Sequence, residues 1–144
     1  MRDARDDLLL RDRLYLPLED AERCGLSEAD LERIIRAGAP PPAAYRRLVR
    51  LQGRRAAALL SRAEEALPHV PLASAVMIGV LIDLHRSLND EMRARGFDTV
   101  SREAERVRVP TLGKLGITAR TAARVLLAPE PRQRCAPRRG LLAS

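Results

Sequence analysis

The sequence predicts an all-α fold, and three observations lead to that prediction. Apolar residues recur at helical spacing in several segments, proline and glycine separate those segments, and no segment has the period-two alternation that is typical of strands. The 144 residues are 46% hydrophobic and 31% charged, a balance that suits a folded chain. We therefore expect a helical bundle of one domain's length.

The first third of the chain is expected to hold three short helices, over residues 1 to about 10, 17 to about 25, and 28 to about 37. The second begins at a proline that can open a helix and stops at a glycine that can end one. At the start of the third, Ser27 and Asp30 have the spacing of a capping box, in which the two residues satisfy each other's backbone N–H groups. Local sequence therefore predicts where these helices begin.

Two long helices and a shorter one are expected in the rest, over residues 43 to about 67, 72–95 and 112 to about 127. The first of these is rich in Ala, Leu and Arg, which favour helix. Apolar side chains recur every four residues along the second, with Met77 and Leu81 beside them. The stripe consists of Leu72, Val76, Val80, Leu84, Leu88 and Met92. We expect it to pack into a core; the wall of a ligand cavity is the alternative.

The predicted domain covers residues 1–127, and residues 128–144 are interpreted as a basic, proline-bearing tail without fixed structure. No apolar stretch approaches the roughly 20 residues that span a bilayer, and the chain begins with charges. The two cysteines lack the spacing of a metal site. We therefore expect a cytoplasmic protein, and peripheral contact with a membrane stays open.

The charge balance is strongly basic, with 26 Lys and Arg against 19 Asp and Glu and a net charge of +7. A diphosphate ligand, an anionic membrane surface and nucleic acid would each suit such a chain. Nucleic acid ranks last, because only three aromatic residues are present for base stacking and the arginines are scattered among acids. A solvated arginine-rich surface explains most of the charge without any partner.

The candidate chemistry lies at the amino terminus, where Asp3 and Asp7 are four residues apart. On a helix, this spacing puts both carboxylates on one face, where a cation between them offsets their repulsion. Mg²⁺ suits such a site, because it takes a few carboxylate oxygens and leaves positions for phosphate. Arg2 and Arg13 are candidate phosphate ligands, and Tyr15 adds a hydroxyl. A plain charged helix face is the competing interpretation.

A longer pattern extends this motif. Residues 2–7 read RDARDD and residues 13–20 read RLYLPLED, which resembles the second aspartate-rich region of squalene and phytoene synthases, N-x-x-R-D-x-x-x-D followed by G-R-x-Y-L-P. Residues 84–98, LHRSLNDEMRARGFD, are similar to that family's L-Y-R-A-I-L-D-E-I-E-A-R-G-Y-D. Residues 106–111, RVRVPT, match its closing motif. The resemblance runs colinearly over about residues 1–127.

The resemblance implies an isoprenoid synthase-type helical bundle, of which this chain is a part, and a transferase that joins two prenyl diphosphates head to head. Asp3 and Asp7 would be the catalytic Mg²⁺ ligands. Arg2, Arg13 and Tyr15 would hold the diphosphate of the substrate. The product would be phytoene or squalene, and the closing motif favours phytoene slightly.

Departures from the family pattern shape a second expectation. The family's first aspartate-rich helix and an asparagine ligand would lie before Met1, so we expect a carboxyl-terminal part that is inactive alone and needs an amino-terminal half as partner. The spacer before Arg13 is one residue longer than in the family, and His85 stands where the family has tyrosine, a position at which we expect core packing. A non-catalytic basic helical module that binds a protein is the alternative function.

Overall fold

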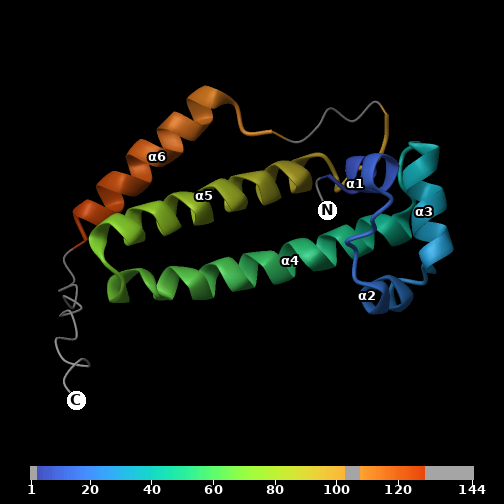
Figure 1. Ribbon diagram of the computed structural model, residues 1–144, viewed down its shortest axis with the longest axis horizontal. Helices are drawn as coiled ribbons and strands as arrows, with labels where there is room; N and C mark the ends of the chain where they lie inside the picture. The colour runs from blue at the N-terminus through green and yellow to red at the C-terminus, as the bar shows by residue number, and fades with distance from the viewer. Residues whose placement is uncertain (1–2, 103–107, 129–144) are drawn as a thin grey trace, which may run out of the picture. The chain divides into compact units, whose positions relative to one another are not determined.

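A computed structural model describes residues 3–102 and 108–128 of the chain. Within these residues every regular element is helical, which confirms the all-α prediction (Figure 1). The elements are α1 (Ala4–Arg11), α2 (Leu18–Arg23), α3 (Glu28–Ala37), α4 (Ala43–Glu65), a 3₁₀ turn (Leu67–His69), α5 (Leu72–Ala94) and α6 (Thr111–Leu126).

The contacts between residues divide the chain into two compact units. Unit 1 comprises residues 1–59 and 86–109, and unit 2 comprises residues 60–85 and 110–144. Helices α4 and α5 each contribute one part to each unit. The predicted boundary between a domain of residues 1–127 and a tail stays a prediction, because residues 129–144 of that tail lie outside the described residues.

The start of α3 confirms the predicted capping box. The Asp30 N–H donates to Ser27 Oγ over 3.1 Å, and the Ser27 N–H donates to Asp30 Oδ2 over 3.0 Å. The helix ends at Gly38, whose φ of 61° lies in the left-handed region that favours glycine. Both ends of α3 are therefore fixed by local sequence.

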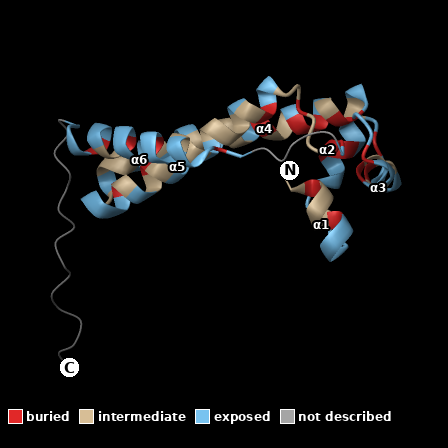
Figure 2. Ribbon diagram, turned by 90° about the horizontal axis from the view of Figure 1, so that it is seen from above, coloured by how far each residue is buried: buried red, intermediate tan, exposed pale blue. Residues whose placement is uncertain are grey.

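Unit 1 holds the hydrophobic core (Figure 2). Its largest fully buried side chains come from α3, α4 and the segment after α5, and they are Leu31, Ile35, Tyr45, Leu48, Val49 and Val100. The Tyr45 hydroxyl lies 3.1 Å from Thr99 Oγ1, and burial raises the pKa of Tyr45 to about 12. The one hydroxyl in this core is therefore hydrogen-bonded, as a buried polar group requires.

In the part of α5 that belongs to unit 2, the buried residues differ from the predicted ones. Ala75 and Ile82 are buried there, whereas Met77 and Leu81 are 68% and 52% exposed. The expectation that Met77 and Leu81 widen the buried stripe is therefore wrong. At Gly79, an added Cβ would lie 3.0 Å from Thr121 Cγ2, so α6 packs against the small residues of α5. The small residue Gly79 permits this close approach, whereas Met77 and Leu81 lie on an exposed face of α5.

None of the helices in the described residues is long and apolar enough to cross a membrane. The expected peripheral membrane contact stays a prediction.

Candidate functional site

The two aspartates predicted as metal ligands lie one turn apart at the start of α1. Asp3 is the N-cap residue, and its carbonyl accepts the Asp7 N–H over 2.9 Å. Both side chains are half-buried. The segment is helical, as the spacing requires. Asp6 also lies in the first turn, so the amino-terminal end of α1 is rich in carboxylates. The structure therefore brings Asp3 and Asp7 together.

Asp7 also has a partner that the sequence did not point to. Its Oδ1 accepts from Arg11 Nη1 over 3.3 Å, one turn further along α1. Arg11 is 69% exposed, whereas the Asp7 side chain is 18% exposed. An ion pair whose arginine is largely exposed contributes little to stability. A cation could therefore replace Arg11 as the partner of Asp7 at small cost in free energy.

A single arginine fixes α1 against the rest of unit 1. Arg5 Nη1 donates to the Val100 carbonyl over 3.3 Å and to the Ile35 carbonyl over 3.5 Å. The Ile35 carbonyl belongs to the last turn of α3, where backbone acceptors lack a partner within the helix. Ala4 and Leu8 of α1 are buried in the core beside these contacts. The acidic turn therefore sits on a packed element.

Arg13 and Tyr15, predicted as diphosphate ligands, are next to each other in the segment that follows α1. Arg13 Nη1 donates to the Tyr15 hydroxyl over 3.2 Å, an interaction that raises the pKa of Arg13 further. Both side chains are exposed, so they are accessible to a ligand. Asp12 has a left-handed φ of 50°, and the Arg13 N–H donates to the Asp7 carbonyl over 3.1 Å. The chain thus turns back at the extra residue of the spacer.

Arg2, the remaining predicted ligand of the diphosphate, lies outside the described residues.

An unpredicted polar network anchors the segment after Tyr15 to α4. Asp20 is 3% exposed, and its carboxylate accepts from Gln52 Nε2 over 2.6 Å and from Arg55 over 2.7 Å and 3.2 Å. The hydrogen bonds from Arg55, and then that from Gln52, lower the pKa of Asp20. Residues 13–20, which include Asp20, belong to the motif that resembles the family, but no pattern in the sequence pointed to this contact with α4. Asp20 therefore joins α2 to α4.

The acidic turn fits Mg²⁺ through the chemistry of its donors. Among the residues that the structure describes, no three His, Cys, Asp or Glu side chains gather into a metal cluster. Mg²⁺ does not need such a cluster, because it is commonly bound by one or two carboxylates, waters and the phosphates of the substrate. Asp3 and Asp7 supply two hard oxygen donors of that kind.

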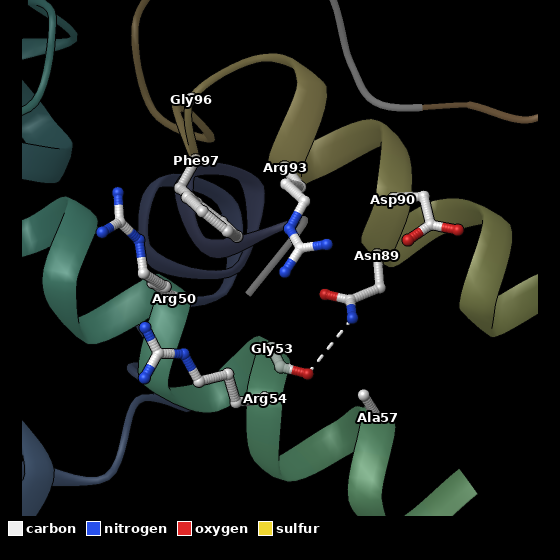
Figure 3. Close-up of a pocket in the computed structure, with 9 residues that line it drawn as sticks. All are labelled: Arg50, Gly53, Arg54, Ala57, Asn89, Asp90, Arg93, Gly96 and Phe97. Carbon is white, nitrogen blue, oxygen red and sulfur yellow. Dashed lines mark hydrogen bonds between the residues drawn. The ribbon is translucent and has the colours of Figure 1, made fainter. Parts of the chain in front are cut away.

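Unit 1 also has a pocket of about 440 Å³ that contains none of the predicted site residues (Figure 3). It is formed by α4, the carboxyl-terminal part of α5 and the residues that follow. Its lining comprises Arg50, Gly53, Arg54, Ala57, Asn89, Asp90, Arg93, Gly96 and Phe97. Asn89, Asp90, Arg93, Gly96 and Phe97 belong to the quoted motif of residues 84–98, but the sequence did not predict the pocket, because its walls come from residues far apart in the chain.

His85, which stands at a tyrosine position of the family pattern, is exposed. Its Nδ1 lies 2.7 Å from the Leu81 carbonyl of the preceding turn. The expectation that it packs into a core is wrong.

The chain is therefore all-α. It carries carboxylates at the start of α1, and a guanidinium group and a hydroxyl in the segment that follows this helix. A model of the squalene/phytoene synthase family matches residues 1–113 of the 144, and the chain belongs to that family. The family acts as prenyl transferases of isoprenoid biosynthesis, binds prenyl diphosphates and uses a divalent metal. Searches of curated proteins and of solved structures gave no match.

Proposed function

We propose that this chain provides the diphosphate-binding part of a Mg²⁺-dependent prenyl transferase that condenses two prenyl diphosphates head to head, with phytoene slightly favoured over squalene as the product. The observation that supports it most is the pair Asp3 and Asp7 on one turn of α1, within the family match. The Arg13–Tyr15 pair follows directly in the chain.

Asp3 and Asp7 would hold Mg²⁺, which would supply positive charge to the oxygens of the leaving diphosphate. Arg13 would add a second positive charge there, and the Tyr15 hydroxyl would orient the Arg13 guanidinium. These groups would stabilise the negative charge that develops on the diphosphate as the C–O bond breaks and the diphosphate leaves with the electron pair. The double bond of the second substrate then forms the new C–C bond, and the resulting cation loses a proton as a cyclopropyl ring closes. The second diphosphate then leaves with its electron pair, the cyclopropyl cation rearranges, and loss of a second proton gives phytoene.

We also propose that activity requires a second aspartate-bearing helix that these 144 residues do not supply. Two aspartates four residues apart occur in the sequence only at Asp3 and Asp7. Mg²⁺ held from one side keeps several waters, and a second set of carboxylates would complete its coordination.

The test incubates the purified chain with Mg²⁺ and geranylgeranyl or farnesyl diphosphate, alone and together with the amino-terminal half of a squalene/phytoene synthase. We expect hydrocarbon product only in the combined reaction. Asp3→Asn and Asp7→Asn should each lower its rate by at least about tenfold, the scale of losing about 1.4 kcal/mol of transition-state stabilisation. The matched control is Asp12→Asn, because the Asp12 side chain is 88% exposed and pairs with Arg36.

Product formation that survives both Asp3→Asn and Asp7→Asn would contradict the assigned roles. The absence of product in every combination would contradict the transferase function itself.

A further inference from the structure

We infer that the pocket between α4 and the end of α5 in unit 1 is a metal-independent binding site for a small phosphate-bearing anion, held by Arg54 and Arg93 with Arg50 beside them. It shares no residue with the acidic turn of α1.

The first argument is the charge of the lining. Three guanidinium groups line the pocket against one carboxylate, that of Asp90. Within the described residues neither Arg54 nor Arg93 has a carboxylate partner. Figure 3 shows the Asp90 carboxylate apart from the three guanidinium groups. The pocket therefore has positive charge that its own side chains leave uncompensated.

Seven other arginines of the described residues differ in this respect. Ion pairs to carboxylates are formed by Arg11, Arg23, Arg33, Arg36, Arg55, Arg95 and Arg124. The chain has 19 acidic residues for such pairing, and the pocket arginines remain apart from them. A gathering of uncompensated guanidinium groups around a concave surface favours an anion.

The second argument is that the walls of the pocket are held in place. The Arg50 guanidinium carbon lies 5.4 Å from the centroid of the buried Phe97 ring, a cation–π contact that restrains Arg50. Asn89 Nδ2 donates to the Gly53 carbonyl over 3.1 Å and joins α5 to α4 (Figure 3). An added Cβ at Gly53 would lie 2.7 Å from Asn89 Oδ1, so a larger residue there would force the Asn89 amide to shift.

The third argument concerns the kind of ligand. Guanidinium groups present planar pairs of N–H donors that match phosphate oxygens. A volume of about 440 Å³ lies within the range of small-molecule sites and exceeds what one phosphate fills. A diphosphate, either free or as the headgroup of a prenyl diphosphate, carries the charge and size that this pocket suits.

The experiment measures binding of inorganic diphosphate to the full chain by isothermal titration calorimetry in the presence of EDTA. We expect saturable binding by the unmodified chain. Arg54→Ala and Arg93→Ala should each weaken it about tenfold or more, because each removes charge-assisted hydrogen bonds. Asp90→Asn should strengthen binding. Arg62→Ala is the matched control on α4, since Arg62 is exposed and lies outside the pocket, and it should leave binding unchanged.

A second arm repeats the titration with farnesyl diphosphate. Equal affinity for the two ligands assigns the site to the diphosphate group alone, and tighter binding of farnesyl diphosphate assigns it to a prenyl-bearing ligand. Because EDTA removes the Mg²⁺ that the proposed site of Asp3 and Asp7 requires, this proposal can fail independently of the transferase function. No binding by the unmodified chain, or an equal loss in Arg62→Ala and Arg93→Ala, would overturn the inference. Circular dichroism of each variant verifies that the helices are retained.

Discussion

Units 1 and 2 bury their apolar side chains to different extents. In unit 1, large side chains such as Leu31 and Leu48 are fully buried and pack into one cluster. In unit 2, the buried apolar residues are few, whereas Leu112, Leu115 and Leu126 on α6 are 82%, 63% and 58% exposed. Helix α6 is therefore apolar on the face that packs and also on a face that does not.

The polar contacts show a related difference. In unit 1, Asp20 and Arg55 join α2 to α4, and Arg5 joins α1 to backbone carbonyls of α3 and of the segment after α5. In unit 2, α6 is joined to α5 by Thr121 and Arg124, both of which donate to Asp83. Side chains that are buried and hydrogen-bonded should carry most of the stability. We expect unit 1 to respond more strongly to substitution.

The largest expected effect is that of Leu31→Ala in the core of unit 1. Leu31 is fully buried, so its truncation should cost about 2–5 kcal/mol of the free energy of unfolding. Leu115→Ala on α6 is the matched control, with an expected change within about 0.5 kcal/mol because that side chain is largely exposed. Urea unfolding followed by circular dichroism measures both. Equal destabilisation would mean that the two units do not differ as described.

The next effect depends on pH and concerns Asp20. The pKa of Asp20 is lowered in the folded state, chiefly by Arg55 and then by Gln52, so the unfolded chain binds the proton more readily. The ionised carboxylate therefore contributes stability above the ordinary pKa of 3.8, and that contribution is lost as pH falls through the folded-state pKa. We expect Asp20→Asn to lower the urea midpoint at pH 7 and to flatten its dependence on pH below about 5.

Asp12→Asn is the control for this pH series, and it should keep the unmodified profile because its carboxylate is 88% exposed. If Asp20→Asn followed the same profile as the unmodified chain, the buried network would not be a source of acid sensitivity.

The smallest effect is that of Ser27→Ala at the capping box of α3. The substitution removes the acceptor of the Asp30 N–H and should cost about 1 kcal/mol. Ser74→Ala, at an exposed position of α5, should change the free energy of unfolding by less than about 0.5 kcal/mol. A thermal melt of both variants checks this, and a larger loss in Ser74→Ala would contradict the role of the cap.

Much of the fold could be predicted from the sequence, because helix ends depend on neighbouring residues. The Ser27–Asp30 box and the prolines and glycines between segments placed the helices close to their observed bounds. Which face of α5 is buried could not be predicted in the same way. Met77 and Leu81 have the hydrophobicity of core residues, but α6 approaches α5 at Gly79, where space decides the packing.

In the candidate site too, residues related by local spacing could be predicted, whereas contacts between residues far apart in the chain could not. Asp3 and Asp7 were found because their spacing is local and the helix period relates them directly. The bonds from Gln52 and Arg55 to Asp20 join residues 32 and 35 positions apart, and the bond from Asn89 to Gly53 spans 36 positions. Such pairings depend on how α4 lies against α2 and α5, which no local spacing specifies.

The small size of Gly53 affects residues elsewhere in the pocket, because Asn89 packs directly against it. A methyl group there would force the Asn89 amide to shift, and this shift would disturb its bond to the Gly53 carbonyl between two residues that line the pocket. An uncharged substitution that contacts no ligand would thus alter how the chain holds an anion. Position 53 is where backbone packing sets the electrostatic geometry of the pocket.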